Sequence, residues 1–226
     1  MTYERLSAII IVVENKHYDM FAVIERGQFM DKTDERSDSE VKQKHVEYDK
    51  QYTYSDYVTW DDDTRWELID GVPYMMSAPT RIHQELSGKI YMQLSLFLKG
   101  KSCKVYYAPF DVRLNADTSD DTVVQPDLLV VCDHSKLDKA GCVGAPDMVV
   151  EILSPSTSRY DQTLKFNTYR KSGIREYWVV DPDTKTLAVH LLKDGDYVTR
   201  PYTDEDLAPV HVLDGCNINL SEVFEE

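Results

Sequence analysis

Two acidic residues stand in or beside strongly apolar runs of this sequence. Glu151 interrupts "MVVEIL", in which every other residue is apolar, and Asp127 follows a proline at the start of "DLLVV". A short, continuous apolar run is typical of a strand that is covered on both faces. An isolated carboxylate is too costly to bury there, so Glu151 must be paired, protonated or bound to a cation.

The partner of Glu151 indicates the chemistry. The polar, turn-rich connection "CDHSKLDKAGCVGAP" favours pairing of the two runs, which would bring Asp127 close to Glu151. Two carboxylates about 4 Å apart repel by about 4 kcal/mol even at an effective dielectric constant of 20. A hard divalent cation removes that repulsion and prefers oxygen ligands. A shared proton or a buried cation is the alternative, and Lys165, near the start of an expected helix, could supply the cation.

Two acids on adjacent strands and a lysine form the set of groups needed for metal-dependent phosphodiester hydrolysis. The metal lowers the pKa of a bound water and polarises a phosphoryl oxygen. The lysine orients the water or stabilises charge that develops in the transition state. We expect Asp127 and Glu151 to bind a hard divalent metal ion, with Lys165 as the catalytic cation. Arg159, Arg170 and Lys171 could hold flanking phosphates.

Three further residues are candidates for supporting this site. Glu67 lies in an expected hairpin, His83 opens an expected helix, and Asp161 precedes Lys165 by one helical turn. Each has an ordinary alternative as a cap, a surface group or, for Asp161, a local pair with Lys165. A buried structural pair of Glu151 with Lys165, without a metal, is the alternative for the main site.

The expected elements place these residues on a mixed α/β sheet. Asp70-Gly71 between two apolar runs predicts a hairpin, and Leu86, Ile90, Leu94 and Leu98 keep helical spacing up to Lys99-Gly100. A second helix is expected over residues 160–172. The runs expected to form strands are "KVYYAP", "FDVRL", "DLLVV", "MVVEIL", "EYWVV", residues 187–192 and the segment after Asp194-Gly195.

Composition restricts the partners and the compartment. Forty acidic and twenty-five basic residues give a net charge of −15, which opposes non-specific binding to nucleic acid or anionic membranes. Basic residues outnumber acidic ones only locally, five to three over residues 151–180. The four cysteines have no zinc spacing, so we expect free thiols in a reducing cytoplasm. No apolar run approaches the length of a membrane span.

The chain divides by composition near residue 50. Residues 1–50 end in "MDKTDERSDSEVKQKHVEYDK", which has almost no apolar residues and is typical of a solvated linker. Residues 51–226 are dense in strand and helix patterns. We expect an N-terminal extension followed by one folded domain.

The motifs "WELIDGVPYMMSAPTRIHQ", "APFDVRL", "QPDLLVV", "DMVVEILSPST" and "GIREYWVVDP" together resemble the Uma-two family of the PD-(D/E)XK nuclease superfamily. The resemblance runs from Tyr52 to Tyr197. It implies a restriction-endonuclease-like mixed sheet flanked by helices, and carboxylates matching Asp127 and Glu151 that hold an Mg²⁺-type ion. Leu153 stands where the wider superfamily has its lysine. The resemblance implies a lysine relocated to the helix, and Lys165 fits that position.

These observations predict a cytoplasmic, metal-dependent DNA endonuclease, in which the carbonyl of Ile152 could add a metal ligand. Superfamily members often pair subunits to cut both strands, so a homodimer is compatible with this hypothesis. The negative charge favours a second hypothesis, a catalytically silent binding or assembly module that keeps the fold. A third treats Asp127 and Glu151 as the acid and base of a glycosidase, which Lys165 between them would disfavour.

Overall fold

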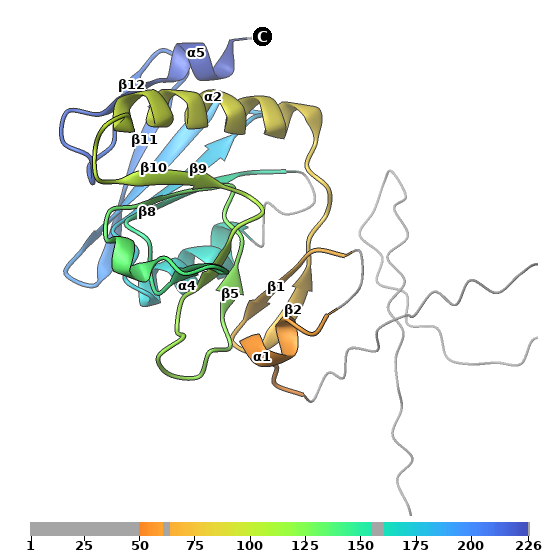
Figure 1. Cartoon of the computed structure of the whole chain (residues 1–226). Coiled ribbons are helices and arrows are strands. Elements are labelled where there is room, and N and C mark those ends of the chain that lie inside the picture. Colours follow the sequence, from red (N-terminus) through yellow and green to blue (C-terminus); the bar gives the residue numbers. More distant parts are fainter. Residues whose placement is uncertain (1–49, 61–63, 155–160, 226) are drawn as a thin grey trace, which may run out of the picture. The chain divides into compact units, whose positions relative to one another are not determined.

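The computed structural model describes residues 50–60, 64–154 and 161–225. Most of the expected N-terminal extension, residues 1–50, lies outside these ranges, so the predicted domain boundary stays a prediction. The mixed α/β, restriction-endonuclease-like architecture expected from the sequence is confirmed (Figure 1). None of the helices in the described ranges has the length and hydropathy needed to cross a bilayer.

The larger sheet has six strands in the order β11-β10-β9-β8-β6-β3. β8 pairs parallel with β9, whereas the other neighbours are antiparallel, which makes the sheet mixed. The strands are β3 (Lys104–Tyr107), β6 (Leu128–Val131), β8 (Met148–Ile152), β9 (Glu176–Asp181), β10 (Thr186–Lys193) and β11 (Asp196–Thr203).

Helices cover both faces of this sheet. On one face lie α2 (Arg81–Leu98) and α5 (Leu220–Phe224), and on the other lies α4 (Phe166–Lys171), which continues from the π-helical turn η2 (Asp161–Lys165) (Figure 1). β6, β8 and β9 are therefore buried on both faces, as their continuous apolar runs predict.

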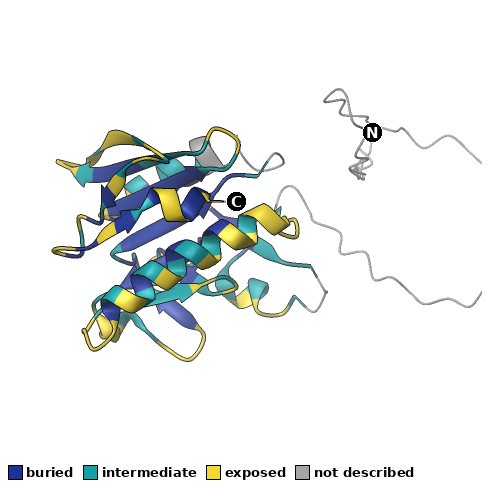
Figure 2. Ribbon diagram, turned by 90° about the horizontal axis from the view of Figure 1, so that it is seen from above, coloured by how far each residue is buried: buried dark blue, intermediate teal, exposed yellow. Residues whose placement is uncertain are grey.

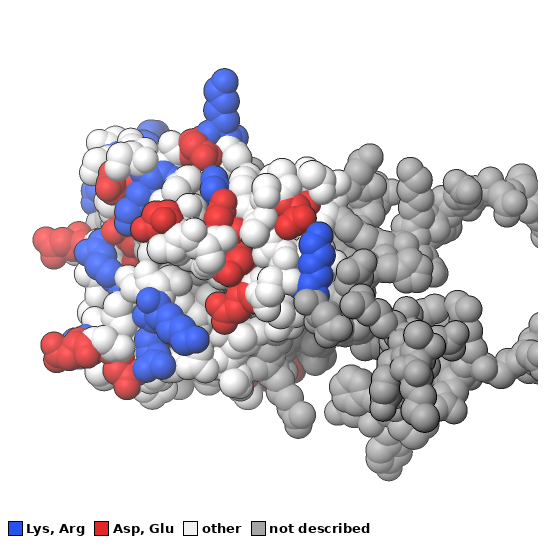
Figure 3. Space-filling view, turned by 90° about the horizontal axis from the view of Figure 1, so that it is seen from below, with Lys and Arg blue, Asp and Glu red and all other residues white. Residues whose placement is uncertain are grey.

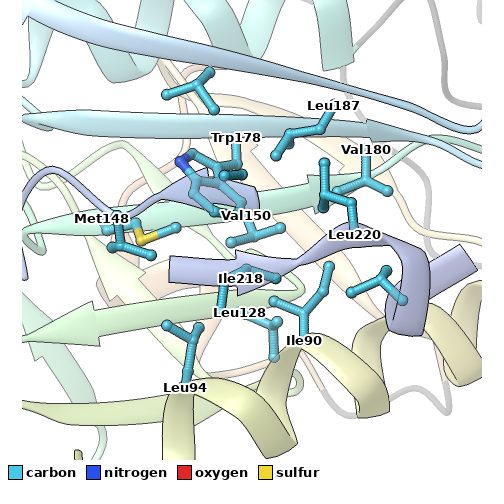
Figure 4. Close-up of a cluster of buried hydrophobic side chains, with 14 of the residues drawn as sticks. Ile90, Leu94, Leu128, Met148, Val150, Trp178, Val180, Leu187, Ile218 and Leu220 are labelled. Atoms are coloured by element: carbon cyan, nitrogen blue, oxygen red, sulfur yellow. The ribbon is translucent and has the colours of Figure 1, made fainter. Parts of the chain in front are cut away.

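The expected helical spacing on α2 is confirmed. Leu86, Ile90, Leu94 and Leu98 are buried, and the Thr80 side chain accepts a hydrogen bond from the first turn, which fixes where the helix begins. Figure 2 shows this amphipathic division, with buried and exposed residues alternating along the helix. The buried stripe packs on side chains of β6, β8 and β9, including Trp178 (Figure 4).

A second sheet has five strands in the order β2-β1-β5-β4-β7. Two of these strands precede β3 in the chain, and the other three lie between β3 and β8. The hairpin expected at Asp70-Gly71 joins β1 to β2, with Ile69 opposite Val72. The strands are β1 (Trp66–Ile69), β2 (Val72–Met75), β4 (Asp111–Arg113), β5 (Val123–Val124) and β7 (Gly141–Val143). The remaining elements are α1 (Tyr54–Tyr57), η1 (His134–Lys136), β12 (Leu207–Pro209) and β13 (Asn217–Asn219).

One expectation about the cysteines is wrong. Cys103 and Cys132 form a disulfide, while Cys142 and Cys216 are free and buried. The register of β3 with β6 pairs Lys104 with Val131, which places the two cysteines opposite each other at the next position. This pairing could not be predicted from the sequence, because 29 residues separate the two thiols and the contact depends on strand register.

His190 on β10 predicts a pH-dependent part of the stability. The residue is 9% exposed, contacts the rings of Phe166, Tyr177 and Tyr197, and its burial lowers the pKa to about 4. A histidine in the unfolded chain takes up its proton near pH 6.5. The unfolded state therefore binds more protons between these two values, and stability falls as the pH drops through this window.

We expect His190→Phe to flatten this dependence by about 1–3 kcal/mol between about pH 7 and about pH 4.5. Urea unfolding of both proteins at the two pH values measures it. An equal loss of unfolding free energy in both proteins between the two pH values would show that His190 does not cause this pH dependence.

Candidate active site

Glu151, the acid within the apolar strand β8, is paired inside the protein. Its residue is 3% exposed, and its Oε1 accepts hydrogen bonds from Lys165 Nζ at 2.8 Å and from the Tyr169 hydroxyl at 2.5 Å. The neighbours of Glu151 on β8 pack into the two apolar clusters on either side of the sheet. One oxygen of this buried carboxylate accepts two hydrogen bonds, so Glu151 is paired, as the sequence analysis requires of an acid in an apolar strand.

Lys165 lies between the two sheets and contacts one carboxylate from each. Its ammonium lies 2.8 Å from Glu151 Oε1 on β8 and 3.1 Å from Glu67 Oε1 on β1, and the residue is 2% exposed. Lys165 is the last residue of η2, directly before α4, so the helix that covers the sheet also carries the lysine into the interior. The convergence of Lys165 on Glu151 is the geometry that the sequence led us to expect.

Glu67 is a central member of this cluster. It is 1% exposed, and its Oε1 also accepts a hydrogen bond at 2.7 Å from the backbone N–H of Gln125. The Gln125 side chain in turn contacts Arg65, Tyr57 and Asp111. Glu67 is therefore held by the backbone and by the ion pair, which fixes one counter-charge of Lys165 in place.

Tyr169 was missed by the sequence reasoning. It lies one helical turn after Lys165, so both side chains project from the same face of the chain toward Glu151. Burial, followed by the nearby charges of Glu151 and Glu67, raises the pKa of Tyr169 well above its usual value. The phenol therefore stays protonated and donates to Glu151. The signal that could have found it is the i, i+4 spacing of Lys165 and Tyr169.

Asp127 lies at the entrance to β6, beside Glu151. The antiparallel register pairs Leu128 with Val150, so the next position sets Asp127 opposite Glu151. Asp127 Oδ2 accepts a hydrogen bond from the backbone N–H of Ile152 at 2.7 Å and lies 3.0 Å from His83 Nε2. Its side chain is 15% exposed, which leaves it more accessible than Glu151.

His83, expected either beside the site or as a local cap, contacts the site acid Asp127. It lies in the first turn of α2, where its backbone N–H donates to the Thr80 side chain. With Nε2 directed at Asp127, its Nδ1 is buried and has no hydrogen-bond partner among the described residues. Buried polar atoms are usually satisfied, so this nitrogen points to a group that the described part of the chain does not supply.

A pocket of about 280 Å³ opens beside Asp127 and His83. It lies between α2 and the end of β3, on the α2 face of the sheet, whereas Lys165 and Tyr169 come from η2 and α4 on the other face. Asp127 lines this pocket and lies at the start of β6. The lining residues are His83, Gln84, Ser87, Gly88, Tyr91, Tyr107, Ala108 and Asp127.

Two of the other expected residues, Arg170 and Lys171, are not brought to this cluster. The side chain of Asp161 and the whole of Arg159 lie outside what the structure describes, so the proposed supporting and phosphate-binding roles of these two stay predictions. Arg170 pairs with Asp196 at 3.2 Å on the surface of the larger sheet. Lys171 is exposed near the end of α4.

The donor set is compatible with a hard cation such as Mg²⁺. In residues 50–60, 64–154 and 161–225, three or more His, Cys, Asp or Glu side chains do not gather as a metal-binding group. Mg²⁺ usually keeps several waters and takes one or two carboxylates together with substrate phosphates, so it does not need such a group. Asp127 and Glu151, on neighbouring strands, are the carboxylates that would hold it.

The chain is similar to known proteins in sequence and in fold. "Uncharacterized protein slr1290" of Synechocystis sp. (strain PCC 6803) is 27% identical over 155 residues, which cover 67% of this chain and 80% of that protein. A crystal structure titled as "a putative nuclease belonging to DUF820" from Anabaena variabilis superposes with a TM-score of 0.62. It is 19% identical, and the match covers 76% of this chain and 97% of the other, which shows a common fold.

The family model described as "Uma2: Putative restriction endonuclease" matches residues 54–221. The match contains β1, Asp127, Glu151 and Lys165, so it spans both sheets and the charged cluster between them. It covers well over half of the chain, and the motifs resembling the Uma-two family lie within it. The chain therefore belongs to the Uma2 family.

Proposed function

We propose that this protein is a metal-dependent phosphodiester hydrolase that cleaves DNA. The observation that carries the proposal is the buried ammonium of Lys165 between Glu67 and Glu151, with Asp127 hydrogen-bonded to the neighbouring Ile152 amide. Burying three charged groups together costs on the order of several kcal/mol per ion in desolvation. Such a cluster is therefore poorly explained by a purely structural role. Membership of a family described as restriction endonucleases supports the same conclusion.

Each residue has a distinct task in this proposal. Asp127 and Glu151 would hold Mg²⁺ or Mn²⁺, and the Ile152 carbonyl could add a ligand. When bound, the ion lowers the pKa of water and polarises the phosphoryl oxygen. Lys165 places a fixed positive charge beside the reacting phosphate and stabilises the negative charge that develops there. Glu67 and Tyr169 keep Lys165 and Glu151 in place, so little reorganisation is needed during the reaction.

The acidic surface bears on the choice of substrate. On the face shown in Figure 3, acidic and basic side chains are interspersed, and the described residues form no continuous basic surface there. The net charge of −15 also opposes capture of DNA by long-range attraction. We propose that binding relies on local contacts at the site, in the cytoplasm, with a homodimer as the arrangement that would cut both strands.

Nuclease assays test this directly. The protein is incubated with duplex, single-stranded and branched DNA, with Mg²⁺, Mn²⁺ or EDTA, and RNA of the same sequence is the comparison. We expect cleavage of at least one DNA substrate that requires the metal and stops in EDTA. Equal cleavage in EDTA, or no cleavage with any metal, would contradict the proposal.

A catalytically silent module remains the second candidate, because the described carboxylates of Glu67 and Glu151 already pair with Lys165. Calorimetric titration with Mn²⁺ separates the two. A metal-dependent hydrolase should bind Mn²⁺ with a measurable heat, and Asp127→Ala should weaken binding by about 10-fold or more, the size of effects at metal-site positions. Thr118→Ala, on an exposed loop, is a matched control. Absence of binding by the unmodified protein favours the silent module.

A further inference from the structure

The pocket beside Asp127 has features that the fold does not explain. Gly88 lies in the interior of α2, where glycine weakens a helix relative to alanine. A Cβ added at Gly88 would meet no heavy atom within 4 Å, so the described protein does not require the small residue for packing. Gly88 also lines the pocket. The absent side chain keeps space open on the pocket side of the helix.

The walls of the pocket combine flat rings with polar groups. Gln84, Ser87 and Tyr91 recur at helical spacing on one face of α2, and Tyr107 faces them from the end of β3. The rings of Tyr91 and Tyr107 meet edge to face, with centroids 5.0 Å apart, and Tyr107 is 58% exposed. Exposed rings beside amide and hydroxyl groups are suited to stack on a base and to hydrogen-bond its edge.

The charge of the pocket limits what can occupy it. Among its described lining residues there is no lysine or arginine, and Asp127 contributes a carboxylate. A phosphate group would therefore meet repulsion without a counter-charge, so the occupant is a neutral part of the substrate. The volume of about 280 Å³ lies at the lower end of ligand pockets, which suits one nucleoside and excludes a base pair within a duplex.

Asp127 relates the position of the pocket to that of the proposed metal site. The residue is shared between the pocket and the proposed metal site, where it accepts a hydrogen bond from Ile152. A group in the pocket is therefore next to the phosphodiester that the site would hold. The buried Nδ1 of His83, which lacks a partner in the described ranges, lies in the same wall.

We propose that this pocket accepts one unpaired nucleoside adjoining the scissile phosphate, so that the protein selects DNA with an unpaired or extruded base over continuous duplex. This inference rests on the proposed function for the location of the phosphate. A base enters such a pocket only after it leaves the stack, and the cost is least where it is already unpaired. Selection would therefore arise from DNA structure.

The test measures binding without catalysis. Fluorescence anisotropy in EDTA at low salt compares three labelled DNAs of one sequence: a perfect duplex, the same duplex with one bulged nucleotide, and the single strand. We expect the bulged and single-stranded DNAs to bind about tenfold or more tightly than the duplex, as expected for one stacked base. Equal affinity for the three DNAs, or no binding of any, would overturn the proposal.

Gly88→Leu places a side chain in the pocket at a position where the fold has room. We expect it to remove the preference, lowering affinity for the bulged DNA by about tenfold. Leu96→Phe is the matched control, because it enlarges a 67% exposed residue on the same helix away from the pocket. Gly88→Ala checks folding, with a midpoint of thermal unfolding expected to rise by about 2–4 °C. Retention of the full preference by Gly88→Leu would refute the pocket's role.

The outcomes distinguish this inference from the proposed hydrolysis. A preference for unpaired DNA that Gly88→Leu removes, without cleavage in any metal, would support the pocket and reject the hydrolase. Metal-dependent cleavage together with equal binding of the three DNAs would support the hydrolase and reject the pocket.

Discussion

Glu151→Gln should abolish metal-dependent cleavage while the protein remains folded. The change keeps the size of the side chain but removes the charge that would bind the cation. We expect the rate of cleavage to fall by about 10²-fold or more, comparable with the loss of one preorganised electrostatic group. Lys165 would still be paired with Glu67 at 3.1 Å, so the buried ammonium keeps a counter-charge.

The control for this variant is its fold. Circular dichroism and thermal unfolding should show a native spectrum, with destabilisation limited to about 1–3 kcal/mol because a charge-assisted hydrogen bond is weakened. Glu205→Gln is a matched control on an exposed turn. A folded Glu151→Gln protein with unchanged cleavage would reject Glu151 as a metal ligand.

Lys165→Met should have the largest effect on stability. It leaves the carboxylates of Glu67 and Glu151 buried without the ammonium that contacts both. Breaking a buried ion pair by removing one partner costs about 3–5 kcal/mol. We also expect cleavage to fall by about 10²-fold or more, since the fixed positive charge is lost. Urea unfolding and nuclease assays measure the two effects.

A second substitution separates the structural and catalytic parts of this effect. Lys165→Met combined with Glu67→Gln removes one of the two buried carboxylates, so it should regain about half or more of the lost stability, to order of magnitude. Cleavage should remain as low as in the single variant. Recovery of cleavage together with stability would mean that Lys165 serves only the fold.

The sequence predicted most of the secondary structure because local patterns determine it. The helix of residues 81–98, the hairpin at Asp70-Gly71 and the apolar strands follow from spacing, capping and turn residues. The division of the strands into two sheets was not predicted, since it depends on which distant strands pair. β5, with two residues, and β7, with three, are too short to give a periodic pattern.

The pairing of Glu151 with Lys165 could be anticipated because a buried acid requires a partner. The contact of Glu67 with Lys165 could not, because it joins two sheets and is 98 residues away along the chain. Glu67 and His83 were named as candidates with local alternatives, and only tertiary packing shows that they contact Lys165 and Asp127. The Cys103–Cys132 disulfide was missed for the same reason.

We propose above all that Asp127 and Glu151 jointly hold a catalytic cation. The most direct measurement is anomalous diffraction from crystals of the protein grown or soaked with Mn²⁺. We predict one strong peak within metal–oxygen bonding distance, about 2.0–2.6 Å, of a carboxylate oxygen from each of the two residues. Full Mn²⁺ occupancy elsewhere in the molecule, with no peak at these carboxylates, would contradict it.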